Sequence, residues 1–257
     1  MELLEIERRT TEQGCFDRSE NQRIYAKFFA TVPRSFLKVV SERGLDRRKV
    51  LDVGCGYGHY LVHFGPGSMG LDANETSERF ARSIGLEVLQ CNVEETIPLP
   101  RESFEAVWCA NLIEHMVAPH LLLSRLHRVL VPDGLLIAKV PVIPPALVRT
   151  VVRLIGKPLG YEAGEHVNAF TPATFAFTLE RAGFKPIEAI SIVLPSPAIQ
   201  AVTAPLTRRL GASITVVAEK DPSFTYADKR LQAFDPRWTE TGYRVDRAST
   251  DNPVKEQ

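Results

Sequence analysis

The sequence lacks an excess of charge of either sign. Its 257 residues include 31 lysines and arginines against 31 aspartates and glutamates, so the formal net charge at pH 7 is zero. The basic residues are scattered and form no dense run. This composition gives no general reason to expect a nucleic-acid partner.

The cysteines lack the spacing of a metal site or a redox pair. The sequence has no CxxC motif and no zinc-type pattern among its four cysteines, which are Cys15, Cys55, Cys91 and Cys109. The last three stand in apolar stretches at the predicted ends of strands, which is typical of buried free thiols in a reducing compartment. We therefore expect free thiols and no metal ion.

Long apolar runs are also absent. The N-terminal stretch MELLEIERRTTEQ alternates acidic and basic residues without an apolar core, so we do not expect a signal peptide. The longest run without charge, Ala189 to Thr207, is interrupted by three prolines and is too polar to span a bilayer. The sequence predicts a soluble cytoplasmic protein without a transmembrane segment.

What the sequence does contain is an alternation of apolar strand patterns with amphipathic helix patterns. Continuous apolar runs such as VLDVGC and LLIAKVPV are typical of strands that are buried on both faces. Helical spacing marks the segments 75–85, 118–134 and 171–184. This alternation predicts an α/β fold with a doubly wound, mostly parallel sheet, and a ligand at the carboxyl ends of the strands. The predicted strands are 50–55, 68–74, 86–93, 103–111, 135–142, KPIEAISIVL and ASITVVAEK.

The most informative stretch is VLDVGCGYGHY, in which a predicted strand enters a turn with three glycines, Gly54, Gly56 and Gly58. A dinucleotide fingerprint needs a further glycine where His59 stands, and a P-loop needs a G-K-[ST] that does not follow. Asp52 precedes the turn, and Asp72 ends the next strand, where a carboxylate can accept hydrogen bonds from a diol such as a ribose. The turn alone is a weak signal, because glycines also serve tight packing.

With its flanking motifs, the chain resembles the class I S-adenosylmethionine-dependent methyltransferases, in the small-molecule branch that includes ubiquinone and menaquinone methyltransferases. The resemblance rests on VLDVGCGYG, GLDAN, CNVEETIPLPRESFEAVWCANLIEHM and LHRVLVPDGLLIAKVP, in that order. It covers about 50–142 strongly, and EHVNAFTPATFAFTLERAGF extends it to about 184. It implies a seven-stranded, Rossmann-like methyltransferase fold and S-adenosyl-L-methionine as cofactor.

The resemblance also implies which residues bind that cofactor. The glycine backbone would lie against the methionine half, Asp52 would face the ammonium group through water, and Asp72 would hold the ribose. Asn92 and Val93 would contact the adenine, although many members carry aspartate at the position of Asn92. The implied set is Asp52, Gly54, Cys55, Gly56, Gly58, Asp72, Asn92, Val93, Ala110 and Asn111. Structural explanations stay open, above all for Cys55 as a small packing residue.

Two histidines are the candidate catalytic residues. His115, in NLIEHM, follows the fourth strand, where acceptor and cofactor meet in this family, and His166, in GEHVNAF, follows an insertion that could fold over the site. A sulfonium methyl group is already activated, so the chemistry needs positioning rather than a metal, and a general base only where the acceptor must lose a proton. Either histidine could instead be structural, and His59 and His63 are expected on a helix after the glycine turn.

The chain divides by composition into an N-terminal helical segment (1–45), a methyltransferase domain (46–220) and a charged tail (221–257) that we expect to be partly disordered. An insertion of about 144–167 follows the fifth strand. It allows three explanations: a lid over the acceptor, a partner-binding helix, or an interfacial helix that meets a membrane.

These features predict transfer of a methyl group from S-adenosyl-L-methionine to a small or lipid-like metabolite. Two rivals stay open: a non-catalytic protein that keeps the cofactor as a structural or regulatory ligand, and a nucleotide-dependent oxidoreductase. The sequence determines neither the acceptor atom nor the oligomeric state.

Overall fold

The computed structural model describes residues 1–13, 16–143, 146, 150, 154, 164–192 and 213–224. The chain divides into two units, Met1–Pro222 and Ser223–Gln257, and only the first two residues of the second unit are described. Most of the predicted insertion, the tail beyond Phe224 and Cys15 lie outside the described residues, so the lid and its alternatives stay predictions.

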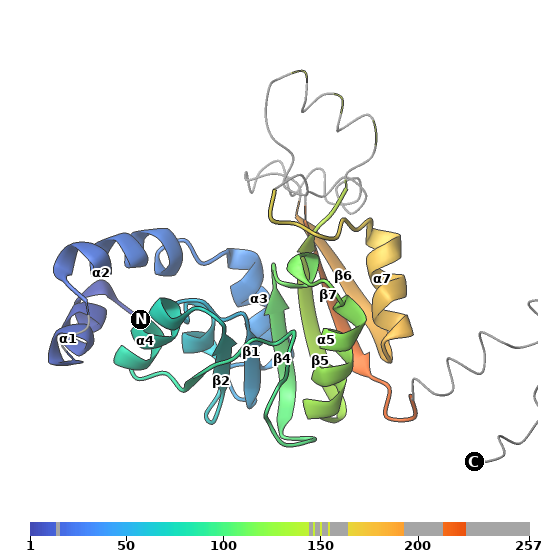
Figure 1. Ribbon diagram of the computed structural model, residues 1–257, viewed down its shortest axis with the longest axis horizontal. Helices are drawn as coiled ribbons and strands as arrows, with labels where there is room; N and C mark the ends of the chain where they lie inside the picture. Colours follow the sequence, from blue (N-terminus) through green and yellow to red (C-terminus); the bar gives the residue numbers. More distant parts are fainter. Residues whose placement is uncertain are drawn as a thin grey trace, which may run out of the picture. The chain divides into compact units, whose positions relative to one another are not determined.

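A seven-stranded sheet organises the first unit, with the strand order β3-β2-β1-β4-β5-β7-β6. The strands are β1 (Val50–Val53), β2 (Met69–Asp72), β3 (Val88–Gln90), β4 (Phe104–Ala110), β5 (Leu130–Pro141), β6 (Phe184–Ile192) and β7 (Ser213–Lys220). The first five are parallel, and β7 runs antiparallel between β5 and β6. In Figure 1, β4 points upward and β7 downward. The carboxyl ends of the parallel strands therefore share one edge, as the doubly wound, mostly parallel prediction requires.

Helices cover both faces of the sheet, because successive residues of a strand point to opposite sides. On one face, α5 (Pro119–Val129) and α7 (Pro172–Arg181) share a core with Val107 and Cys109 of β4. On the other face, Phe36 of α3 (Arg34–Arg43) packs edge-on against Trp108 of the same strand. The alternating burial of β4 thus determines where the two helical layers lie.

The N-terminal segment packs on the helix that follows β2. It consists of α1 (Leu3–Gln13), α2 (Arg18–Ile24) and the π-helix η1 (Tyr25–Phe29), which Figure 1 shows beside α4 (Glu75–Ser83). Ile6 and Ile24 share a buried cluster with Phe80 of α4. The Asn74 side chain caps α4 by accepting a hydrogen bond from the Ser77 backbone at 3.0 Å. The helix that follows the carboxyl end of β2 is therefore fixed by its packing against the N-terminal segment and by its N-cap.

The prediction of a helix after the glycine turn is wrong. The chain forms only a short 3₁₀ turn there, η2 (Leu61–His63), so His59 precedes a helical turn and His63 ends it. Gly65 follows closely and passes the backbone of Arg47 so tightly that a Cβ there would lie 2.5 Å from the Arg47 carbonyl carbon. This close approach, followed by Pro66, leaves no room for further helical turns.

The predicted end of the helix over 118–134 is also wrong. The helix α5 ends at Val129, and the expected Pro-Asp-Gly turn lies inside β5 instead. Leu130 already pairs with Phe104 of β4, and the register between β4 and β5 shifts before the next pair, Ala106 with Leu135. Asp133, with a φ of 59°, lies in the part of β5 where this shift occurs. Pro132 cannot continue a helix, so the backbone joins the sheet early. Among the described helices, none combines the length and apolarity needed to cross a bilayer.

Candidate functional site

The glycine turn lies at the carboxyl end of β1, beside the carboxyl end of β2. Gly54, Gly56 and Gly58 have φ values of 73°, 52° and 82°, which residues with a Cβ rarely adopt. The N–H groups of Gly54 and Cys55 donate to the Leu71 carbonyl of β2, at 2.8 and 3.0 Å. The turn is therefore fixed at the edge of the sheet where the prediction places the ligand.

The three glycines serve different purposes. A Cβ at Gly58 would lie 2.3 Å from Leu86, and one at Gly54 would lie 3.3 Å from Leu112, whereas one at Gly56 would meet nothing within 4 Å. Packing inside the protein therefore leaves less room for a Cβ at position 58 than at 56. A bare backbone facing open space at Gly56 suits the close approach of a ligand.

Cys55 belongs to the implied cofactor set, but its side chain packs inside the protein. The thiol is 1% exposed, and a Cβ at Gly70 would lie 2.5 Å from its sulfur. Burial raises the pKa of Cys55, so the thiol stays protonated at neutral pH. Only the backbone of Cys55 can therefore face a ligand, which agrees with the interpretation of Cys55 as a small packing residue.

Asp72 joins the glycine turn to the start of α4. Its two carboxylate oxygens accept hydrogen bonds from the N–H groups of Gly56, at 2.7 Å, and Asn74, at 2.8 Å. Each oxygen of a carboxylate has a further lone pair. The half-buried Asp72 can therefore accept hydrogen bonds from a diol while it orders the turn.

Asp52 is buried next to this carboxylate. Its side chain is in the core of β1, and its Oδ2 atom has no hydrogen-bond partner among the described residues. Burial, and secondarily the charge of Asp72, raises the pKa of Asp52. A nearby cation would favour the ionised form of Asp52. The turn thus suits a ligand with a positive charge and a diol, which S-adenosyl-L-methionine has.

The other residues of the implied cofactor set follow β3 and β4 at the same edge. The exposed Asn92 side chain accepts from the Glu94 N–H at 3.1 Å, so its carbonyl is already used once, and Val93 is buried. Asn111 follows Ala110 with a φ of 53°, in the left-handed region that asparagine adopts more readily than most residues with a Cβ. Backbone conformations of this kind cluster at functional sites.

The two predicted catalytic histidines lie side by side. The 3₁₀ turn η3 (Ile113–His115) places His115 directly after β4. The N–H groups of Val167 and Asn168 donate to the Glu114 carbonyl, at 2.9 and 2.8 Å, and so hold the segment that carries His166. The His115 and His166 rings have centroids 4.8 Å apart at an angle of 74°. The structure thus brings together two histidines that are far apart in sequence.

Sequence reasoning missed Glu114 as a candidate. Its side chain is 1% exposed, and neither carboxylate oxygen has a hydrogen-bond partner among the described residues. Burial raises the pKa of Glu114, and burial lowers the pKa of Lys139 on β5, an effect that the Glu114 charge opposes. The motif NLIEHM carried the signal, since Glu114 precedes His115 directly, but its burial is a tertiary effect.

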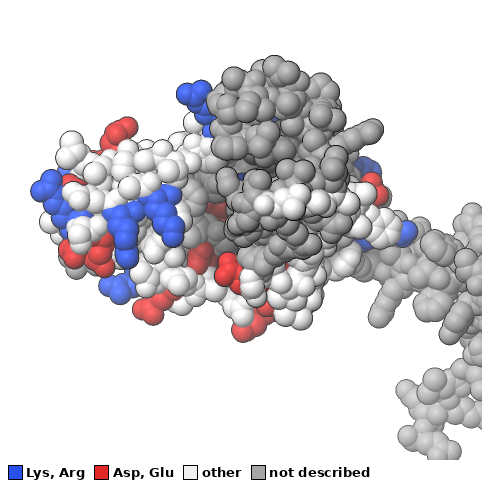
Figure 2. Space-filling view, turned by 90° about the horizontal axis from the view of Figure 1, so that it is seen from above, with Lys and Arg blue, Asp and Glu red and all other residues white. Residues whose placement is uncertain are grey.

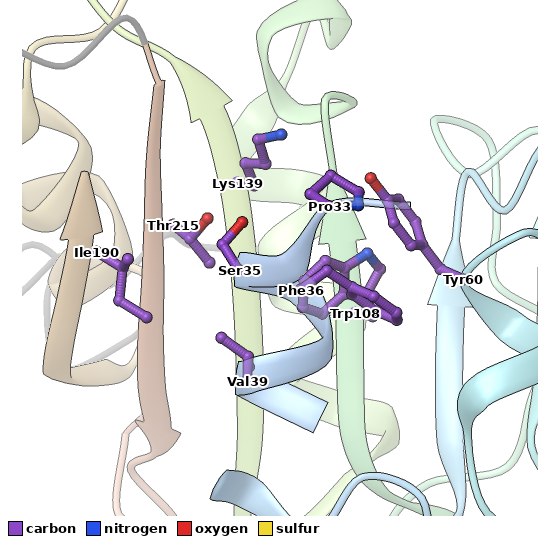
Figure 3. Close-up of a pocket in the computed structure, with 9 residues that line it drawn as sticks. All are labelled: Pro33, Ser35, Phe36, Val39, Tyr60, Trp108, Lys139, Ile190 and Thr215. Atoms are coloured by element: carbon purple, nitrogen blue, oxygen red, sulfur yellow. The ribbon is translucent and has the colours of Figure 1, made fainter. Parts of the chain in front are cut away.

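A small cavity lies under α3, on the face of the sheet opposite to α5 and α7. Figure 3 shows Phe36 and Trp108 in contact beside Tyr60, with Lys139 above them. The cavity has a volume of about 10 Å³, room for about one water molecule. It is too small for a metabolite-sized acceptor. Figure 2 views the carboxyl edge of the sheet from above, and the described part of the visible face carries side chains of both signs.

Comparison with known proteins agrees with this arrangement. Residues 51–138 match a family described as "Methyltransferase domain". The ubiquinone biosynthesis O-methyltransferase of Hahella chejuensis is 32% identical over 108 residues, which cover 38% of this chain and 45% of that protein. A SAM-dependent methyltransferase structure from Aquifex aeolicus covers 86% of this chain and 99% of its own, with a TM-score of 0.52 and 20% identity.

Two limits on these similarities bear on function. The chain spans about half the length of the curated relatives that it matches, 45% and 50% in two of them. The structure of a protein named the [4+2]-cyclase SpnF also aligns, with a TM-score of 0.55 and 17% identity over 73% of this chain and 80% of its own. The structural likeness therefore shows the fold, and the reaction has to be argued from the site.

Proposed function

We propose that this chain, in which residues 51–138 form a class I methyltransferase domain, transfers the methyl group of S-adenosyl-L-methionine to a small or lipid-like acceptor. The observation that carries the proposal is the glycine turn, in which Asp72 accepts from the Gly56 N–H while the buried Asp52 leaves one oxygen without a partner. The bound cofactor supplies an activated methyl group. The protein binds it, orients the acceptor and excludes water.

The acceptor end of the site is proposed to lie at His115 and His166. Both follow the carboxyl edge of the sheet, and His115 comes five residues after the end of β4 at Ala110. Asn111 and Ala110 lie between these histidines and the glycine turn along the same edge. A hydroxyl or amine acceptor placed there would have a histidine within reach to take its proton.

Exposed apolar side chains beside the two histidines support a lipid-like acceptor. Val117 is 76% exposed and Val167 is 61% exposed, and the Val167 N–H is bonded to the Glu114 carbonyl. Leu121, on the first turn of α5, is also exposed. Exposed apolar side chains near a site offer contacts for an apolar ligand. The relatives named ubiquinone biosynthesis O-methyltransferase suggest an acceptor hydroxyl on a molecule with an apolar tail.

The substitution Asp52→Asn is expected to affect stability and binding in opposite directions. The pKa of Asp52 is raised in the folded protein, so the wild-type protein loses stability as pH rises from the unfolded pKa, about 3.9, through the folded pKa. Asparagine does not titrate and therefore removes that loss. In the absence of ligand, the free energy of unfolding of Asp52→Asn should exceed that of the wild type. This difference should be larger at pH 8 than at pH 5.

The same variant should bind S-adenosylhomocysteine more weakly by about 1 kcal/mol, or about fivefold, the usual value of one hydrogen bond. Denaturant unfolding at both pH values and calorimetry measure the two effects. A variant that is less stable at pH 8 and binds with unchanged affinity would show that Asp52 is a structural carboxylate.

A pair of glycine substitutions tests the turn against a matched control. Gly56 and Gly67 both have positive φ, 52° and 74°, and neither has a rigid neighbour where a Cβ would lie. Alanine at either position should cost about 1–2 kcal/mol of stability. Only Gly56→Ala should also weaken binding of S-adenosylhomocysteine, by about 1–3 kcal/mol through overpacking. Equal affinities of the two variants would place the ligand elsewhere.

Turnover itself is tested with S-adenosylmethionine that carries an isotopic label on the methyl group. The full chain is incubated with the labelled cofactor and a metabolite and lipid extract, and products are identified by mass. A labelled small or lipid-like product that Asp72→Ala does not form supports the proposal. Cofactor binding without any labelled product would favour a non-catalytic binding protein, and the proposal of methyl transfer would fail.

A further inference from the structure

Glu114, His115 and His166 form a group of potential metal ligands. One carboxylate oxygen and one ring nitrogen from each histidine all lie within 4.8 Å of one another. The backbone fixes this arrangement, since the Val167 and Asn168 N–H groups donate to the Glu114 carbonyl and the Asn168 side-chain amide donates to the Met116 carbonyl at 2.6 Å. The three side chains therefore converge from two segments that are tied together.

The Glu114 carboxyl group is placed to bind a cation. It is 1% exposed, and among the described residues neither of its oxygens accepts a hydrogen bond. A buried carboxylate without partners is unfavourable, and buried charges in proteins are paired or coordinate metals. Nε2 of His115 is 4.0 Å from Oε1 of Glu114, which is beyond hydrogen-bond distance. Glu114 thus lies beside His115 without a hydrogen bond to it.

The hydrogen bond on the far side of His115 determines which nitrogen faces Glu114. Its Nδ1 lies 3.1 Å from the Glu165 carbonyl oxygen. A carbonyl only accepts, so Nδ1 is the donor in this hydrogen bond, and Nε2 is the ring nitrogen that faces Glu114. A second hydrogen bond of this kind is what metal-binding histidines make to orient the ring. A metal ion between Nε2 of His115 and the Glu114 carboxyl group would give both of them a partner.

We propose that Glu114, His115 and His166 bind one divalent transition-metal ion of the zinc type. Two imidazoles and one carboxylate are a typical ligand set for such an ion, and three protein ligands leave a position open. Bonds of about 2.0–2.2 Å would bring ligand atoms to about 3.3 Å from one another, so the partly exposed histidines must move inward by about 1.5 Å or less. If the proposed function holds, the open position takes an oxygen of the acceptor.

Metal binding is measured on the full chain without cofactor, so its outcome is independent of the proposed methyl transfer. The protein is stripped with a chelator, the chelator is removed, and Zn²⁺ is titrated in competition with a chromophoric chelator. We expect one ion per chain. Glu114→Gln and His166→Ala should each weaken the affinity for Zn²⁺ by at least about tenfold, which is the lower end of the range for changes at a metal site. His120→Ala, an exposed histidine on α5, should bind like the wild type.

A second probe separates this site from the cysteines. Co²⁺ bound by nitrogen and oxygen ligands should give visible d–d absorption without a thiolate charge-transfer band, and Zn²⁺ should raise the melting temperature of the wild type but not of His166→Ala. A thiolate band, undiminished binding in both variants, or no stoichiometric binding by the wild type would overturn the proposal. His166 lies in a surface segment, so its variant keeps the test valid even where Glu114→Gln fails to fold.

Discussion

Replacing His115 by alanine should lower turnover by about 10²–10⁴-fold, the range for loss of a group that handles a proton or activates the acceptor. Affinity for S-adenosylhomocysteine should stay within about twofold of the wild type, because His115 takes no part in the hydrogen bonds of the glycine turn and is proposed to contact the acceptor. Steady-state kinetics and calorimetry on the same preparations measure the two quantities.

A second variant at this position separates chemistry from structure. The side-chain amide of His115→Asn can still donate to the Glu165 carbonyl, as Nδ1 does, but places no atom where Nε2 faces Glu114. We expect His115→Asn to lose nearly as much turnover as His115→Ala, and His120→Ala to stay within about twofold of the wild type. An asparagine variant with nearly full turnover would make His115 a purely structural residue.

Replacing Asp72 by alanine should weaken the binding of S-adenosylhomocysteine by about 1.5–3 kcal/mol, or about 10- to 150-fold, as expected for the loss of hydrogen bonds to a charged group. Two effects contribute: loss of the acceptor for the ribose hydroxyls, and loss of the bonds that Asp72 accepts from Gly56 and Asn74. A double-mutant cycle with a 2′-deoxyribose analogue of S-adenosylhomocysteine separates them.

In this cycle the wild type should prefer the ribose ligand over its deoxy analogue, and Asp72→Ala should bind both about equally. Asn74→Ala, which removes the N-cap of α4, is the matched control. It should lose about 1 kcal/mol of stability and keep the preference. If Asp72→Ala keeps the wild-type preference for the ribose ligand, Asp72 only orders the turn and another group binds the sugar.

The sheet and the glycine turn were predictable because their signals are local. VLDVGC is apolar at the positions that β1 buries except Asp52, and the order of strand and helix patterns is enough to predict a doubly wound sheet. The missing helix after the turn was not predictable from periodicity. It is lost because Gly65 passes the Arg47 backbone at close range, and that contact exists only in the folded chain.

The candidate site shows the same division. Asp72 was predictable as the acid that ends β2, but its role in ordering Gly56 depends on a tertiary hydrogen bond. His115 and His166 were singled out separately, whereas their proximity and the burial of Glu114 arise from the pairing of Val167 and Asn168 with the Glu114 carbonyl. The expectation of no metal rested on the cysteine spacing and on the activated sulfonium methyl group, and neither carries information about a site of histidine and glutamate.

Calorimetric titration of the full chain with S-adenosylhomocysteine, and in parallel with NADH, tests most directly whether the glycine turn is a methyltransferase cofactor site. We predict one S-adenosylhomocysteine bound per chain, an affinity reduced by Gly56→Ala but not by Gly67→Ala, and no binding of NADH. Binding of NADH in place of S-adenosylhomocysteine, or S-adenosylhomocysteine affinity that is the same in both glycine variants, would contradict the assignment of the cofactor to this turn.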